Sequence, residues 1–117
     1  MLRFAADENF NNQITEGILE RNPAVDIIRI QKSPVSGAGD PIMLEWVARE
    51  DRILLTHDLR TVPSFAYQRI RAGLRMPGVL AVRDTIPVGR VIEELLLLAE
   101  YSLESEYADQ VRYLPLS

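Results

Sequence analysis

Cysteine is absent from this sequence, and histidine occurs only once, as His57. The lack of cysteine excludes disulfide bonds, thiolate catalysis and zinc sites with cysteine ligands. A single histidine excludes metal sites built from several histidines and most histidine-based proton relays. The catalytic chemistry that remains open is mainly that of carboxylates.

Long apolar runs are absent as well. The longest wholly apolar stretch covers residues 95–99, whereas a membrane-crossing helix needs about 20 residues. The N-terminal residues, MLRFAADENF, carry acids at positions 7 and 8 and lack the apolar centre of a secretory signal. We therefore expect a cytoplasmic protein without a membrane partner. A length of 117 residues, 47% of them hydrophobic, fits a single domain over residues 1–117.

Basic residues are fewer than acidic ones, at 13 against 17, which gives a net charge of −4. The molecule as a whole is therefore not expected to attract phosphate backbones. The charges are segregated, since residues 59–83 hold five arginines and no acid, whereas residues 93–109 hold six acids and no base. Two solvated helix faces of opposite sign would explain this pattern, and so would a function that uses the arginines.

Short apolar runs alternate with amphipathic segments along the chain. The pattern predicts strands at 2–6, 25–30, 52–56 and 79–82, a fifth at 111–114, and helices at 11–21, 61–74 and from positions 40 and 87 onward. Such alternation with short connections predicts an α/β three-layer sandwich, in which helices cover both faces of a parallel sheet of four to five strands. In such sheets ligands bind beyond the carboxyl ends of the strands.

Acidic residues stand where these strands end. Asp7 and Glu8 follow the first strand, Asp58 the third and Asp84 the fourth, while Asp40 opens the helix that leads to the third. Carboxylates gathered at one sheet edge repel one another unless a cation joins them. Oxygen ligands of this kind suit Mg²⁺ or Mn²⁺. The pattern predicts a metal site at Asp7, Asp40, Asp58 and Asp84, and it favours phosphodiester chemistry.

Each acid also has a purely structural explanation. Asp40 precedes Pro41 and would serve as a helix cap alone. Asp58 would cap the helix that follows it, and Asp84 would belong to a turn. His57 is expected to point away from Asp58, because neighbouring residues of a strand face opposite sides of the sheet.

The segments that carry these acids resemble a known family. FAADENF near the start, GAGDPIMLEWVAREDRILLTHD in the middle and PGVLAVR later are similar to short PIN-like domains related to the VapC ribonuclease toxins of toxin–antitoxin systems. The resemblance implies that Asp7, Asp40 and Asp58 are catalytic, that divalent ions activate water for RNA cleavage, and that an antitoxin is a partner. Classical PIN nucleases carry an acid on a middle helix and more acids late in the chain, whereas here Asp40 stands at a helix start and Asp84 is the candidate fourth acid.

The arginine-rich segment has a use in this interpretation, because arginines can contact RNA phosphates and aromatic rings can stack on bases. A helix that faces solvent is the alternative. The candidate substrate-binding residues are Asn9, Arg60, Arg69 and Arg71.

Two other functions stay open. A catalytically inactive PIN-like module would bind a partner through its acidic last helix or through Leu97 and Tyr101, which lie off the apolar stripe of that helix. The same pair would suit a homodimer, although scattered exposed apolar residues are common. A signalling receiver domain would use the acids at positions 7, 8 and 58 but also a lysine after its fifth strand, whereas the one lysine here is Lys32.

Overall fold

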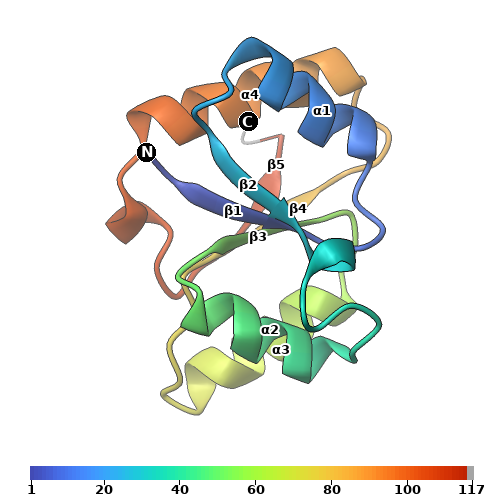
Figure 1. Ribbon diagram of the computed structural model, residues 1–117. Helices are drawn as coiled ribbons and strands as arrows, with labels where there is room; N and C mark the ends of the chain where they lie inside the picture. The colour runs from blue at the N-terminus through green and yellow to red at the C-terminus, as the bar shows by residue number, and fades with distance from the viewer. Residues whose placement is uncertain (116–117) are drawn as a thin grey trace.

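Five strands form one parallel sheet in the computed structural model, which describes residues 1–115 (Figure 1). The strands are β1 (Arg3–Ala6), β2 (Asp26–Arg29), β3 (Ile53–Thr56), β4 (Val79–Val82) and β5 (Val111–Leu114). Their order across the sheet is β2-β1-β3-β4-β5. The predicted parallel sheet is confirmed, including its fifth strand.

Four α-helices cover the two faces of the sheet. The helices are α1 (Asn12–Arg21), α2 (Asp40–Arg49), α3 (Thr61–Arg71) and α4 (Val88–Tyr101). Helices α1 and α4 pack together on one face, and α2 and α3 lie on the other (Figure 1). Two short 3₁₀ helices, η1 (Ile30–Lys32) and η2 (Glu104–Glu106), lie in connections. The predicted three-layer arrangement is confirmed.

Two apolar clusters hold these layers together. On the α1/α4 face, Phe4, Ile18 and Leu95 are fully buried, and on the α2/α3 face Leu44 and Leu54 are. Strands β3 and β4 are buried along their whole length, which explains their nearly continuous apolar sequences.

The apolar stripes of two helices test the predicted packing. The apolar stripe of α4 is buried at Val91, Ile92, Leu95 and Ala99, whereas Leu97 and Tyr101 lie off it and are exposed. The helix predicted over 61–74 is three residues too long, because α3 ends at Arg71 and Leu74 is 51% exposed.

The connection from β4 to β5 has the opposite hand to the connection from β3 to β4. Both connections step in the same direction across the sheet, but α3 lies on one face and α4 on the other. Connections between parallel strands are almost always right-handed, so this one is unusual. Because of it, α4 lies beside α1, and its end reaches β1, where the Leu2 N–H donates to the Ala99 carbonyl at 3.2 Å.

Within residues 1–115, the helices are too short or too polar for any of them to cross a membrane.

Candidate active site

The chain runs from β1 to β2 on one side of it and then returns to β3 on the other side of β1. The strand order therefore changes direction between β1 and β3. In open parallel sheets, ligands bind at such a switch point, beyond the carboxyl ends of the strands. Asp7 follows β1 directly, and its backbone N–H donates to the Leu55 carbonyl of β3 at 2.9 Å. The first predicted site residue therefore lies at the switch point.

Thr56, the last residue of β3, links two of the predicted acids. Its side chain is fully buried, and its Oγ1 donates to Oδ2 of Asp7 at 2.9 Å. The same Oγ1 accepts a hydrogen bond from the backbone N–H of Asp58 at 3.0 Å. The other oxygen of Asp7, Oδ1, accepts from the Glu8 N–H at 2.7 Å. Both oxygens of the Asp7 carboxylate are thus hydrogen-bonded, Oδ2 to the Thr56 hydroxyl and Oδ1 to the adjacent Glu8 N–H.

Asp58 lies at the start of α3 and accepts hydrogen bonds from its free backbone N–H groups. Its Oδ1 accepts from the N–H groups of Arg60 and Thr61, both at 2.8 Å. Arg60 occupies the cap position of α3, so Asp58 binds the first helical N–H, that of Thr61, from two residues before the cap. Its second oxygen, Oδ2, has no hydrogen-bond partner within residues 1–115 and remains free to contact a ligand.

Asp40 is the first residue of α2, and Gly39 occupies the cap position before it. No side chain among residues 1–115 caps this helix, so the alternative that Asp40 serves as its cap is wrong. The pKa of Asp40 is raised above its ordinary value of 3.8, first by burial and then by the negative charges of Asp7 and Asp58. Asp40, at the start of α2, therefore lies close enough to Asp7 and Asp58 to be repelled by both.

No cation offsets this repulsion among the described residues. The four ion pairs found within residues 1–115 involve none of Asp7, Asp40 and Asp58. In the same part of the chain, no three His, Cys, Asp or Glu side chains are arranged closely enough to hold a metal ion together. Asp7 and Asp58 thus affect the charge of Asp40, but within residues 1–115 the acids do not form a group of three ligands around one metal position.

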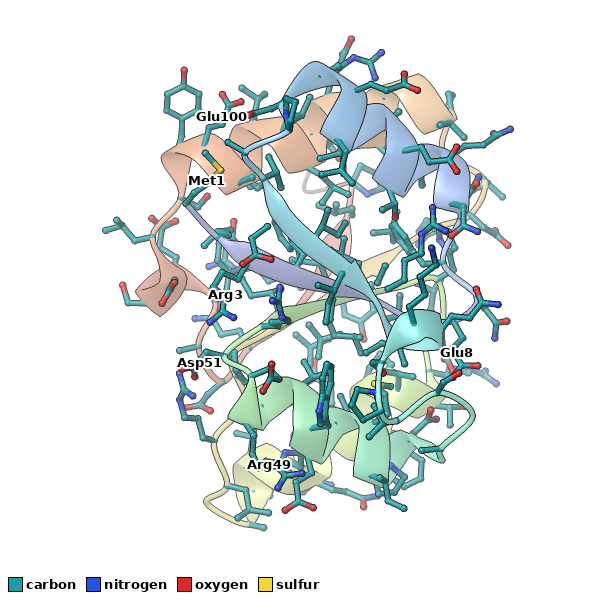
Figure 2. All side chains as sticks on the ribbon, viewed as in Figure 1. Met1, Arg3, Glu8, Arg49, Asp51 and Glu100 are labelled. Atoms are coloured by element: carbon teal, nitrogen blue, oxygen red, sulfur yellow. The ribbon has the colours of Figure 1, made fainter. Side chains whose placement is uncertain are left out.

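Glu8 links the segment after β1 to the loop before α2. Its Oε1 accepts a hydrogen bond from the Gly37 N–H and so tethers the loop that leads to α2. Figure 2 shows Glu8 beside that loop. Gly37 has a φ of 78°, a left-handed conformation that glycine adopts without strain. The tether holds the loop that delivers Asp40.

His57 points to the opposite face of the sheet, as the alternation of strand residues predicted. Its ring stacks on Phe10, with centroids 4.5 Å apart. Its Nδ1 lies 2.8 Å from the Val82 carbonyl, and its Nε2 accepts from the Asn11 N–H at 3.2 Å. A ring that donates through Nδ1 and accepts through Nε2 is a neutral imidazole. His57 therefore holds together the loops after β1 and β4 and does not contact the acids.

Asp84 lies on that same side. It lines a cavity together with Asn9 and His57, and it is not among the charges that raise the pKa of Asp40. The structure therefore separates Asp84 from the other three predicted ligands.

The predicted arginines lie at different distances from the acids. Arg60 immediately precedes α3, beside Asp58, and its side chain is exposed. Arg69 and Arg71 belong to the last turn of α3, about 12 Å and about 15 Å along the helix from Thr61 at 1.5 Å per residue. The Arg69 guanidinium donates to the Arg75 carbonyl at 3.0 Å, at this far end.

Sequence reasoning gave no role to Thr56 or Gly37. The signal for Thr56 was a hydroxyl residue at the last position of an otherwise apolar strand, directly before His57 and Asp58. The partner of Gly37 is 29 positions away, and no local pattern indicates such a contact.

Comparison of this chain with protein-family models, with curated proteins and with solved structures gives no match. The PIN-like resemblance therefore rests on the residues themselves, and any function has to be argued from the site.

Proposed function

We propose that this protein is a divalent-metal-dependent ribonuclease of PIN-like type that acts as the toxin of a toxin–antitoxin pair. One observation carries the proposal. Asp7, Asp40 and Asp58 converge from three elements at the β1/β3 switch point, with a raised pKa at Asp40 and no cation to neutralise them. A site that is electrostatically costly when empty is typical of one built to bind a cation.

The donor set fits Mg²⁺ or Mn²⁺. Both ions prefer oxygen ligands, and Mg²⁺ is commonly held by one or two carboxylates, with waters and substrate phosphates completing its shell. Such coordination does not need three side chains in direct contact, so it is compatible with the lack of a three-ligand group within residues 1–115. Asp7, Asp40 and Asp58 would hold the ion. Asp84 is left out of this ligand set, because it lines a separate cavity on the α1/α4 face.

The chain's own residues would have distinct tasks. Thr56 keeps the Asp7 carboxylate in one orientation, because its Oγ1 also holds the backbone of Asp58. Asp40 would accept a hydrogen bond from a water in the site and so orient it. When bound, the metal supplies positive charge that polarises the scissile phosphate and lowers the pKa of a water.

Substrate contacts would come from the rim of the site. Arg60 is exposed next to Asp58, where a phosphate or sugar of the RNA would lie. Asn9 is exposed as well, but it lines the cavity on the α1/α4 face, so it would contact another part of the RNA. Arg69 and Arg71 are too far along α3 to reach the same phosphate, so they would contact a nucleotide further along the strand.

Cleavage of a single-stranded RNA in Mn²⁺, with and without EDTA, tests the proposal. We expect EDTA-sensitive cleavage by the wild type and a loss of at least a hundredfold in Asp7→Asn. Glu45→Gln is the matched control, because Glu45 is an exposed acid of α2 outside the site. Cleavage that survives both EDTA and Asp7→Asn would come from a contaminant or another site and would contradict the proposal.

A second candidate is an inactive module that binds a partner, and exposed apolar side chains favour it. Leu97 and Tyr101 of α4 are 58% and 78% exposed, and Met1 and Leu103 are exposed as well. Figure 2 places Met1 and Glu100 at this same end of the molecule. An antitoxin or a second copy of the chain would cover these residues. Leu97→Glu should then abolish partner binding or dimerisation in sedimentation experiments without changing Mn²⁺ affinity.

A receiver domain is the third candidate. The strand order β2-β1-β3-β4-β5 is the order that receivers of the flavodoxin-like class use. In that interpretation Asp58 would accept a phosphoryl group, but β5 carries no lysine to hold it. Incubation with acetyl phosphate and intact-mass measurement distinguishes this candidate, and we expect no phosphorylation.

A further inference from the structure

A cavity of about 330 Å³ opens at the same edge of the sheet as the acids, but on the α1/α4 face. Its volume lies at the lower end of the range for small-molecule sites, about 300–1,000 Å³. Two of its lining residues adjoin the acidic site in sequence, since Asn9 is two positions from Asp7 and His57 precedes Asp58. The unusual crossover of α4 creates this cavity, because it brings the start of α4 beside the start of α1.

The inner walls of the cavity are apolar and fixed. Ile14 of α1 is buried, and Ile86 and Val88 are half-buried. The His57 ring also lines the cavity and cannot turn, because both of its nitrogens are hydrogen-bonded and it stacks on Phe10. A flat, largely apolar group would fit between such walls.

The polar groups at the rim have no partners within the described residues. Asn9, Arg83 and Asp84 make no side-chain hydrogen bond or ion pair to any of residues 1–115, although Arg83 and Asp84 are adjacent and of opposite charge. Asn11 uses its Oδ1 to accept from the Gln13 N–H and leaves its amide donors free. The cavity therefore offers a guanidinium, a carboxylate and amide groups around an apolar interior.

This combination selects among the four RNA bases. An arginine pairs best with the O6 and N7 acceptors of guanine. A carboxylate accepts from N–H donors, and guanine presents two of them side by side, at N1 and N2. Adenine lacks the acceptor at position 6, uracil has one N–H donor on its pairing edge, and cytosine has one amino group. Among the four bases, only guanine can therefore make two hydrogen bonds to the guanidinium and two to the carboxylate at the same time.

We propose that this cavity binds an unpaired guanine base of an RNA strand, with Asp84 and Arg83 as the residues that recognise it. The inference rests on the proposed ribonuclease function for its biological meaning, but the binding itself needs neither metal nor catalysis. It gives Asp84 a role that explains its separation from the other three acids. Sequence-specific RNA recognition commonly uses unpaired bases held in this way.

Titration of the protein with GMP, AMP, CMP and UMP in EDTA, followed by NMR, tests the inference. We expect GMP to shift the methyl signals of Ile14, Ile86 and Val88 and to bind about tenfold or more tightly than the other three nucleotides. Asp84→Asn and Arg83→Gln should each weaken GMP binding by about tenfold. The controls are Glu93→Gln and Arg49→Gln, two exposed residues outside the cavity, of which Arg49 lies on the lower helical layer in Figure 2.

The outcomes separate this inference from the proposed function. Equal shifts with all four nucleotides, or no shift of the three methyl groups at millimolar GMP, would overturn it even if EDTA-sensitive RNA cleavage is observed. Selective GMP binding that both variants weaken would support it even if the protein cleaves no RNA. Cleavage with a preference for sites next to guanosine, lost in Asp84→Asn, would support the inference and the proposed function together.

Discussion

Oγ1 of Thr56 donates to Oδ2 of Asp7 at 2.9 Å and at the same time accepts from the Asp58 N–H, so one buried hydroxyl joins the ends of β1 and β3. Its position at the switch point of the sheet makes it the structural centre of the candidate site. Side chains that orient metal ligands typically change metal affinity when they are replaced.

Replacement of this hydroxyl should weaken metal binding. Thr56→Val keeps the shape of the side chain but leaves Oδ2 of Asp7 and the Asp58 N–H without this partner. We expect the Mn²⁺ affinity to fall about tenfold to a hundredfold, and the free energy of unfolding to fall by about 1 kcal/mol. Calorimetry and thermal denaturation measure the two effects. Thr56→Ser keeps the hydroxyl and should retain most of the Mn²⁺ affinity. An equal loss of Mn²⁺ affinity in Thr56→Val and Thr56→Ser would show that the hydrogen bonds of Thr56 do not determine metal binding.

Asp40 should lower stability when no metal is present. Its raised pKa means that the folded state binds this proton more tightly than the unfolded state does. Its contribution to stability is therefore most favourable below pH 3.8 and decreases as the pH rises through the folded-state pKa. Asp40→Asn removes the charge, and in EDTA at neutral pH its melting temperature should exceed that of the wild type by a few degrees. A lower melting temperature would mean that the favourable effect of Asp40 on the α2 dipole outweighs the repulsion.

The opposite edge of the sheet carries a network of charged residues. We expect this network to dominate the loss of folding stability at acidic pH. Asp26 accepts from the Arg52 guanidinium at 2.7 Å and from Arg3 at 3.2 Å. The hydrogen bond from buried Arg52 is the main reason that the pKa of Asp26 lies below 3.8. The stability that Asp26 contributes is thus present above pH 3.8 and is lost as the pH falls through its folded-state pKa.

Asp26→Asn should lower the free energy of unfolding at neutral pH by about 0.5–1 kcal/mol, because it leaves the buried Arg52 without a charged partner, while solvent screens the pair at the 45% exposed Asp26 side chain. Urea denaturation at several pH values measures this. The difference from the wild type should shrink below pH 3.8, and a constant difference at all pH values would contradict the assigned cause.

Gly78 tests the packing of the chain before β4 against Tyr107, in the connection from α4 to β5, and Gly89 serves as its comparison. Gly78 has a φ of 143°, and an added Cβ would lie 2.8 Å from the Tyr107 carbonyl oxygen. Gly78→Ala should therefore lower the free energy of unfolding by roughly 1–3 kcal/mol. Gly89 lies in α4 with nothing near its Cβ position, so Gly89→Ala should raise stability by about 0.5–1 kcal/mol. Similar effects of both changes in thermal denaturation would contradict this packing.

The sequence predicted the layers and the positions of the strands, because apolar periodicity and helix-starting residues such as Pro41 and Pro87 are local signals. The convergence of Asp7, Asp40 and Asp58 was also predictable, since parallel strands end at one edge. The separation of Asp84 was not, because it depends on which face of the sheet the chain turns to after β4. The exposure of Leu74 was missed for a similar reason: α3 ends three residues earlier than its apolar pattern indicates.

The central claim is that the acids at the β1/β3 switch point bind a divalent ion, and calorimetric titration with Mn²⁺ tests it most directly. Wild type and Glu45→Gln should bind Mn²⁺ with equal affinity, whereas Asp7→Asn should lose binding while it remains folded by circular dichroism. Absence of Mn²⁺ binding to the wild type at millimolar concentration, or unchanged binding in Asp7→Asn, would contradict the claim and leave partner binding through Leu97 and Tyr101 as the better explanation.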